Sequence, residues 1–398
     1  MTFSPKISDV TERSEKSKTS VEPVEKTSEK HKKISATFAL VNLMKGMVGP
    51  GCLSLPLAFK QGGLWASFAV DFLLGIISII CMMKIVKCAQ FLCKRNKCGT
   101  LDYGQMAEAA FASSYKPLVR FRLVARWFVN FCLIFLQIGI LSVYYIFVVD
   151  HAKEELATAR HIPTSQLPAF TNVNGIVMAA GSILYSLEGQ AMVLPLENKM
   201  KHPEDMDGLN GVLSTGVSLV TLIYAACGFY GYITYGNNVQ GSVTLNLSDT
   251  PLNLAVKCML LCVVYSSFLI QQYPIVEMLW PLAKRPLRAR NTKRVYIIAL
   301  EYLFRFSIAI VALGLAWLIP NLDQIIPLIG VTAGMLLALV LPAILEIVVF
   351  IEEWRANCTT FKLFIHIGLD CFYAILGLFF LVTGLQANIK NLMQGESS

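Results

Sequence analysis

Two short stretches, GMVGPG at residues 46–51 and SLEG at residues 186–189, interrupt apolar segments that are long enough to cross a membrane. The segments run from about residue 36 to 58 and from about residue 172 to 195. A helix in lipid must satisfy every backbone N–H and C=O group internally, and three glycines and a proline in six residues work against that. Such breaks are tolerated where protein or water surrounds them, and the freed backbone groups can then bind a ligand. Paired broken spans are typical of secondary transporters.

The composition is that of a polytopic membrane protein. The 398 residues are 55% hydrophobic and only 15% charged, whereas a soluble domain is near a quarter charged. Crossing a hydrocarbon core of ~30 Å takes ~20 helical residues. Nine segments meet that length, near residues 36–58, 64–92, 123–149, 172–195, 212–235, 252–280, 295–319, 322–350 and 361–388. We therefore predict an all-α fold with nine spans.

The chain divides into three predicted parts. Residues 1–35 are polar and have almost no large apolar side chains, so we expect a disordered cytosolic tail without a cleavable signal peptide. Residues 36–388 form the transmembrane transporter domain, and residues 389–398 a short C-terminal tail.

The positive charges predict the orientation in the membrane. Of the 34 lysines and arginines, 27 lie in the N-terminal tail, in alternate connections or in the span ends next to these connections, which places the N-terminus in the cytosol and the C-terminus outside. This bias accounts for the net charge of +8 without a nucleic-acid partner. Of two N-glycosylation sequons, only Asn246 is on the outer side, so we expect modification there and not at Asn357.

The first break offers backbone groups to a small zwitterion. The residues are Gly46, Val48, Gly49 and Gly51. Half-helix N-termini carry partial positive charge that suits a carboxylate, and freed carbonyl groups suit an ammonium. The alternative is a Gly/Pro kink that serves helix packing, which is common in membranes.

Charged residues within the spans have two interpretations each. Glu188, beside Gly189 at the second break, is predicted to load and release a proton; the alternative is a structural carboxyl bonded to a neighbouring helix. Lys45 is expected to have a structural role. Arg305 and Glu346 are each expected to be paired within the bundle or near its ends, and not to belong to a transport pathway.

Other polar side chains in the spans are expected to be structural. Asp71, Glu197 and Lys199 are predicted near the span ends, where they would form gating or structural ion pairs. The third and sixth spans carry further polar side chains that we expect to mediate helix packing: Gln137, Tyr144, Tyr145, Tyr265, Ser266, Ser267, Gln271, Gln272 and Tyr273.

The sequence argues against an enzyme. Its five histidines show no HExxH spacing, and GxSxG, Walker A and CxxC motifs are absent. The eleven cysteines have no metal-ligand spacing. We therefore expect no catalytic residue, no metal and no cofactor.

Three motifs resemble one family. Residues 45–58 (KGMVGPGCLSLPLA) resemble its first-span pattern KGNIGTGxLxLPLA. SLEG, followed by VLPLENKM at residues 193–200, is similar to its SFEG…VLPLENKM stretch. Residues 235–247, YG followed by QGSVTLNL, resemble its FGxxxQGSITLNL loop. The chain thus resembles the proton-coupled amino acid transporters of the amino acid/auxin permease superfamily over roughly residues 36–385.

The resemblance implies a LeuT-like fold, in which two five-helix inverted repeats are followed by an eleventh helix. It implies that small neutral amino acids move with protons into the cytosol, and that substrate binds where the first helix of each repeat is unwound. The implied substrate-binding residues are Gly46, Val48, Gly49, Gly51, Ser186, Leu187 and Gly189, with Glu188 as the coupling residue.

This chain departs from the family pattern in three respects. A histidine implicated in proton coupling is replaced by Asn42, which cannot titrate. The usual Asn and Thr of the first-span motif are Met47 and Pro50. The stretch 150–171 is too short and polar to hold the fourth and fifth helices, so we predict an incomplete LeuT-like fold with nine spans rather than eleven.

We therefore expect secondary active transport of small neutral amino acids, coupled to protons, in the plasma membrane or an endolysosomal membrane. The main alternative is a shortened form that does not transport by itself or that depends on another membrane subunit. An amino-acid sensor or a channel is a further alternative. The expected partners are the amino acid, protons and membrane lipid.

Overall fold

The computed structural model describes residues 33–114, 116–151, 162–242, 251–289, 293–319, 321–357 and 359–395. Residues Ile34–Ser398 belong to one compact unit. The long helices are α2 (Ala36–Met47), α3 (Pro50–Gly62), α4 (Leu64–Asn96), α5 (Tyr103–Ala112), α7 (Arg122–His151), α8 (Val173–Ser186), α9 (Gln190–Glu197), α10 (Val212–Tyr235), α11 (Pro251–Gln271), α12 (Tyr273–Ala289), α13 (Arg294–Leu318), α14 (Leu322–Ile329), α15 (Leu341–Asn357) and α16 (Thr360–Gly395). The short elements are α6 (Lys116–Val119), the 3₁₀ turns η1 (Thr164–Gln166), η2 (Pro203–Met206) and η3 (Gly236–Asn238), and the π-helical turns η5 (Gly330–Gly334) and η6 (Leu336–Val340).

The spans agree with the sequence prediction. Eight helical segments of the described residues are long and apolar enough to cross a membrane, and α2 with α3 forms a bent ninth. The eight are Leu64–Asn96, Arg122–Ile146, Val173–Glu197, Val212–Asn238, Cys258–Leu287, Arg294–Leu318, Leu322–Ala356 and Thr360–Lys390. The described residues form no strand beyond one isolated bridge between Ile34 and Met200. The all-α polytopic prediction is confirmed.

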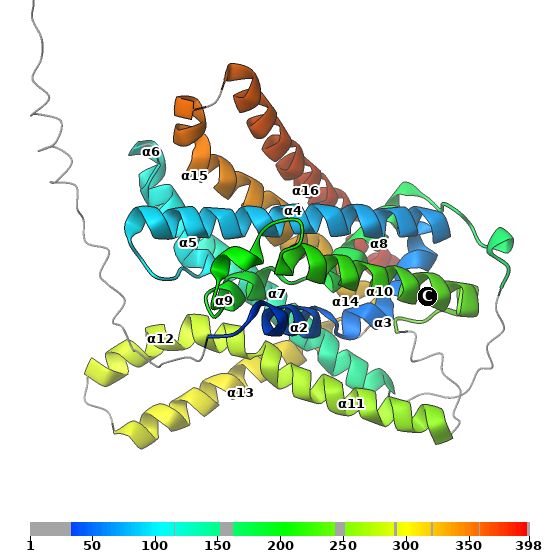
Figure 1. Cartoon of the computed structure of the whole chain (residues 1–398). Helices are drawn as coiled ribbons and strands as arrows, with labels where there is room; N and C mark the ends of the chain where they lie inside the picture. Colours follow the sequence, from blue (N-terminus) through cyan, green and yellow to red (C-terminus); the bar gives the residue numbers. More distant parts are fainter. Residues whose placement is uncertain are drawn as a thin grey trace, which may run out of the picture. The chain divides into compact units, whose positions relative to one another are not determined.

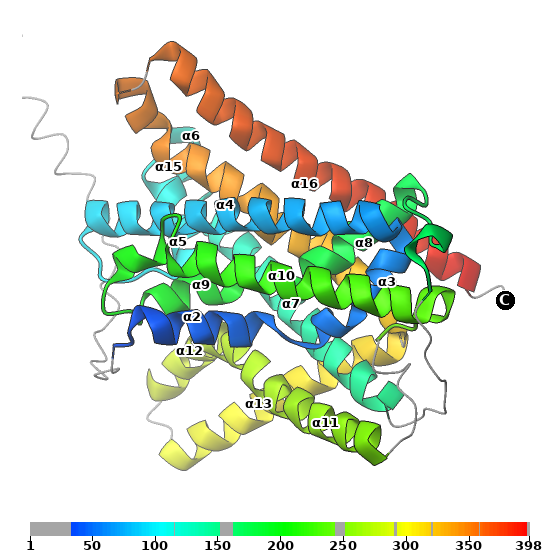
Figure 2. The same cartoon turned by 45° about the vertical axis from the view of Figure 1, so that its right-hand side comes forward.

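The two broken spans lie at the centre of the packing. α3 packs along α8, and α8 also contacts α14, η5, α16 and α4. α10 lies against α2, α3 and α4, and both views show α2, α10 and α4 side by side (Figures 1 and 2). α15 and α16 flank this group on one side, and α11, α12 and α13 lie on the opposite side, joined to it through α7 (Figure 2).

The structure differs from the predicted ranges at three places. α16 continues to Gly395, past the residue 388 where we predict the last span to end. The predicted sixth span consists of two helices, α11 and α12, separated at Gln272. Pro274, two residues later, has no N–H to continue the helical ladder, which accounts for the interruption. Ile34 is already ordered, because its backbone bonds to Lys199 and Lys201.

Candidate functional site

The first break separates α2 from α3. α2 ends at Met47 and α3 begins at Pro50. The two residues between them, Val48 and Gly49, have extended backbones, and the helices are bent by 56°. Proline disfavours a helical conformation in the residue before it but is well tolerated as a first helical residue. Pro50 therefore ends one half-helix and starts the next, and the predicted break is confirmed.

The second break separates α8 from α9. α8 ends at Ser186 and α9 starts at Gln190, so the helix is interrupted at Leu187, Glu188 and Gly189. The Oε1 atom of Glu188 accepts a hydrogen bond from the backbone N–H of Ala191 at 3.5 Å. The carboxylate thus caps the N-terminus of α9, where partial positive charge favours an anion.

This capping bond involves only one of the two carboxylate oxygens of Glu188. Its Oε2 atom is buried and has no hydrogen-bond partner within the described part of the chain. Buried carboxylate oxygens are normally paired, so this oxygen is free to accept a proton or a donor group from a ligand. The sequence alternative of a bond to an adjacent helix finds no support among the described residues.

The two breaks lie against each other. A Cβ atom on Gly51 would lie 3.1 Å from the Cα atom of Ser186, which is closer than most Cβ contacts in proteins, so the two backbones approach closely here. The Tyr224 hydroxyl of α10 lies 2.8 Å from the carbonyl oxygen of Met47 and 2.9 Å from that of Ser186. It donates its one proton to these two acceptors, which are the last carbonyl groups of α2 and α8. Tyr224 is fully buried and joins both breaks at one point.

Sequence reasoning missed Tyr224. It singled out polar side chains of the third and sixth spans, tyrosines among them, whereas Tyr224 lies in α10. The hydroxyl of a tyrosine within a span is expected to form a hydrogen bond, but the sequence does not identify the acceptor.

Methionine side chains fill the space beside the glycines of the breaks. A Cβ atom on Gly46 would overlap the end of Met192, which comes from α9. A Cβ atom on Gly189 would lie 3.2 Å from Met82 Cε and 3.3 Å from Met47 Sδ. Methionine is flexible and adapts to the shape of what it contacts, so these three side chains can yield to a small occupant.

A hydroxyl from α7 reaches the first break. The Tyr144 Oη atom would lie 3.3 Å from a Cβ atom on Gly49. The same hydroxyl is hydrogen-bonded to the side chains of Ser267 and Gln271 on α11. Residues that we expected to serve packing alone therefore place a polar group of the third span beside the break.

The remaining predicted site residues differ in exposure. Leu187 is completely buried, whereas Val48 is 42% exposed. Asn42 and Lys45 are exposed on α2 and share a side of the helix with Val48, at spacings of three residues. The structure brings both breaks together through Gly51 and Ser186, and it leaves one side of α2 uncovered.

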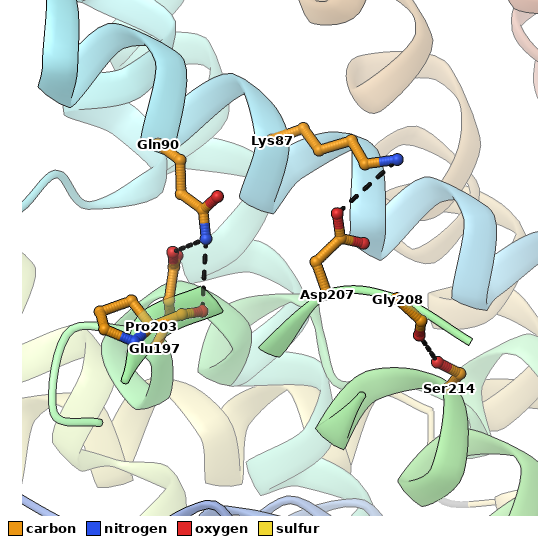
Figure 3. A network of polar contacts seen from close by, with 7 residues as sticks. All are labelled: Lys87, Gln90, Glu197, Pro203, Asp207, Gly208 and Ser214. Atoms are coloured by element: carbon orange, nitrogen blue, oxygen red, sulfur yellow. Dashed lines mark hydrogen bonds and ion pairs between the residues drawn. The ribbon is translucent and has the colours of Figure 1, made fainter. Parts of the chain in front are cut away.

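Hydrogen bonds tie the end of α9 to α4 (Figure 3). The Gln90 side chain donates from Nε2 to Glu197 Oε1 at 2.8 Å and to the Pro203 carbonyl oxygen at 3.3 Å. Nearby, Lys87 Nζ lies 3.7 Å from Asp207 Oδ2. The Glu197 carboxylate is thus held by an amide, and the second broken span is anchored to α4 just beyond its break.

Arg305 and Glu346 each have an ion-pair partner, as predicted. Arg305 Nη2 lies 2.9 Å from Glu301 Oε1, one turn earlier on α13. Glu346 of α15 and Asp370 of α16 both bind the ammonium of Lys84. The Lys84 ammonium also lies 5.1 Å from the centre of the Tyr373 ring. The cluster of Lys84, Glu346 and Asp370 joins three helices.

Asp71 forms no ion pair with any described residue, so the prediction of an ion pair at this position is wrong. Its side chain is 0% exposed. Neither carboxylate oxygen has a hydrogen-bond partner among the described residues, and no cation there pairs with it. In the same part of the chain, no group of three or more His, Cys, Asp or Glu side chains is arranged to hold a metal ion.

Residues 32–154 and 148–389 match the family described as "Transmembrane amino acid transporter protein". The chain belongs to this family. It is similar to "Probable amino acid transporter skat-1" of Caenorhabditis elegans, with 28% identity over 421 residues that include 92% of this chain and 91% of the relative. It is also similar to "Proton-coupled amino acid transporter-like protein pathetic" of Drosophila melanogaster, with 27% identity over 416 residues that include 90% of this chain and 85% of the relative. Family membership identifies a multi-pass membrane transporter and not an enzyme.

The alignment with the nematode protein has more positions than there are residues of this chain in it. Ninety-two per cent of 398 residues is about 366 residues, and the alignment has 421 positions. The difference, about 55 positions, has no counterpart in this chain. The two family matches meet at residues 148–154, which is where the sequence lacks apolar segments.

Proposed function

We propose that this protein is a secondary active transporter that moves small neutral amino acids together with protons and binds them between the breaks of its first and fourth spans. The observation that carries the proposal is the Tyr224 hydroxyl, which contacts the carbonyl oxygens of both Met47 and Ser186. This hydroxyl brings together the ends of α2 and α8, so two breaks about 140 residues apart in the sequence lie next to each other.

The N-terminus of α3 is the proposed contact for the substrate carboxylate. The first N–H groups of a helix have no intrahelical partner, and Gly49 supplies no side-chain cap to α3. Pro50 has no N–H, and the Cys52 N–H bonds to the Gly49 carbonyl oxygen at 3.1 Å, so the Gly51 N–H is the proposed donor. The partial positive charge at this helix end favours an anion. At α9 the carboxylate of Glu188 already occupies the equivalent position. The backbone of Gly46, Val48, Gly49 and Gly51 therefore supplies most of the proposed carboxylate and ammonium contacts.

The second break completes the proposed site. Its backbone at Ser186, Leu187 and Gly189 faces the first break, since Ser186 lies against Gly51. The space beside Gly46 and beside Gly189 is filled by methionine side chains. A substrate side chain must displace or share room with these methionines, which supports a small, uncharged one.

Glu188 is the proposed coupling residue at the break. One of its oxygens is buried and has no hydrogen-bond partner in the described part of the chain, and carboxyl groups within spans often belong to proton pathways. Asn42 stands where many relatives carry a histidine and cannot take this role. The name of the Drosophila relative describes it as proton-coupled amino acid transporter-like, which supports coupling here.

The test is uptake of labelled glycine, alanine and proline into proteoliposomes, with and without an inward proton gradient. We expect saturable uptake that the gradient accelerates, and competition by unlabelled small neutral amino acids but not by lysine or glutamate. Glu188→Gln should abolish the acceleration. The matched control is Glu277→Gln, which changes an exposed carboxylate of α12 and should behave as wild type. Non-saturating flux would contradict the proposal.

The second candidate is a shortened form that needs a membrane partner. It is favoured by the roughly 55 aligned positions of the nematode relative that this chain lacks, because two spans of ~20 residues with their connections need about that many. We propose that these are the fourth and fifth helices. Uptake by the folded, purified chain alone would reject this candidate, and uptake that requires a second membrane subunit would support it.

We also propose that the N-terminus is cytosolic, on the strength of the charge distribution. Asn246 lies outside the described residues; its glycosylation in cells would support this orientation, and glycosylation of Asn357 would contradict it. Fluorescence of a tagged chain in cells would decide between the plasma membrane and an endolysosomal membrane.

A further inference from the structure

Asp71 lies inside the helix bundle, and no described residue is a partner for its carboxyl group. It is 0% exposed, and both carboxylate oxygens lack a hydrogen bond among the described residues. No lysine, arginine or histidine of the described residues donates a hydrogen bond to either oxygen. Buried carboxylates in folded proteins are normally paired. An unpaired one within a membrane span is a candidate functional group.

The position of Asp71 follows from the contact between α4 and α10. One turn further along α4, a Cβ atom on Gly75 would lie 2.8 Å from Thr221 Cγ2 of α10. Asp71 shares that face of α4, because residues four apart lie above one another on a helix. The titratable groups that face it are Tyr224 of α10 and the Cys52 thiol of α3, with Cys227 hydrogen-bonded to Cys52. None of these groups carries a positive charge.

We propose that Asp71 is a second proton-binding site of the transport cycle, distinct from Glu188. In the conformation described here an ionised Asp71 would be buried without a counter-charge or a donor, which is strongly unfavourable, so the side chain holds a proton. When the helices rearrange and water reaches α4, the O–H bond breaks, the proton leaves to water and the carboxylate keeps the electron pair.

Tyr224 would couple the ionisation of Asp71 to the contact between the two breaks. While Asp71 is protonated, the Tyr224 hydroxyl donates to the carbonyl oxygens of Met47 and Ser186. A carboxylate is a stronger acceptor than a carbonyl group, so an ionised Asp71 would compete for the same hydroxyl proton. Loss of the proton from Asp71 would thus release the bond that holds the two breaks together. This step rests on the proposed substrate site, whereas proton binding itself does not.

The first test compares Asp71→Asn with Ser78→Ala in proteoliposomes. Ser78 is also buried on α4 with an unpartnered hydroxyl, so it is a matched control. D71N should lose the acceleration of uptake by a proton gradient while keeping exchange of labelled for unlabelled amino acid without a gradient; S78A should keep both. Acceleration that persists in D71N would overturn the proposal. A sodium gradient that drives the wild type but not D71N would overturn it in favour of a sodium site.

The second test does not depend on transport. Infrared spectroscopy of purified protein detects the C=O stretching band of a protonated carboxyl group, and we expect a band at neutral pH that D71N lacks and E188Q retains. If D71N does not fold, Asp71→Glu keeps the group and should shift the band while preserving coupling. Identical bands in the wild type and the Asp71 variants would overturn the proposal. A wild type that shows the band but no uptake would instead count against the proposed transport function.

Discussion

The two halves of α4 bury charge in opposite ways. The N-terminal half holds Asp71, which has no partner among the described residues. The C-terminal half holds Lys84, whose ammonium is bound by Glu346 and Asp370 and lies over the Tyr373 ring. The sites are 13 residues apart, about 20 Å along a helix axis. Partners on two other helices make the Lys84 cluster a structural joint, whereas Asp71 has no such partner in the described part of the chain.

The sharpest test of this contrast removes each charge in turn. Lys84→Met leaves two buried carboxylates without a cation, so we expect the free energy of unfolding to fall by about 3–5 kcal/mol. Asp71→Leu replaces an unpaired carboxyl by an apolar side chain of similar size, which should leave stability unchanged or raise it. Thermal unfolding in detergent measures both. Equal losses in the two variants would mean that Asp71 has a structural partner and that the contrast is false.

The next prediction concerns the contact between the two breaks. Gly51→Ala places a methyl group 3.1 Å from the Cα atom of Ser186, and overpacking of this kind costs about 1–3 kcal/mol. Uptake should be lost with it, because the half-helices must separate to make room. Gly314→Ala is the matched control: no atom lies within 4 Å of a Cβ atom there, and replacing a helical glycine gains up to about 1 kcal/mol. Undiminished uptake by G51A would contradict the arrangement of the site.

Tyr224→Phe tests the link between the α4 carboxyl and the breaks. It removes one hydroxyl and leaves the Met47 and Ser186 carbonyl oxygens without that donor, which should cost about 1–2 kcal/mol. We expect exchange to persist and its acceleration by a proton gradient to weaken. Tyr230→Phe, at a side chain that is 63% exposed, should change neither quantity. Unaltered coupling in Y224F would show that Asp71 acts through another group.

The sequence was sufficient to predict the architecture but only part of the site. Pro50 and the glycines around it determine their own backbone, so the first break was predictable from local chemistry. The lengths of the apolar segments likewise predicted the spans. The two partners of the Tyr224 hydroxyl were not predicted, and an ion pair was wrongly predicted for Asp71, because the surroundings of both residues come from other helices. Their type and position in the sequence contain no information about which helices pack beside them.

The same limit explains the mixed outcome for charged residues. Arg305 has its partner Glu301 one turn away on the same helix, a spacing that is visible in the sequence. Glu346 meets Lys84 across 262 residues, and only the general cost of buried charge predicted that it is paired. That argument predicts a partner for Asp71 equally well, and there it fails. A carboxyl group can also meet the cost by binding a proton, and the sequence does not distinguish these outcomes.

Lys87 provides the smallest expected effect and the closest comparison with Lys84, from which it is one turn away on α4. Its ammonium lies 3.7 Å from Asp207, and the two side chains are 49% and 24% exposed, whereas the Lys84 side chain is 12% exposed. Water and ions screen such an exposed pair, which contributes about 0–1 kcal/mol. Lys87→Ala should therefore change the unfolding temperature little, and less still in high salt. A loss as large as that of K84M would mean that the number of ion pairs, and not their burial, determines the stability of this end of the bundle.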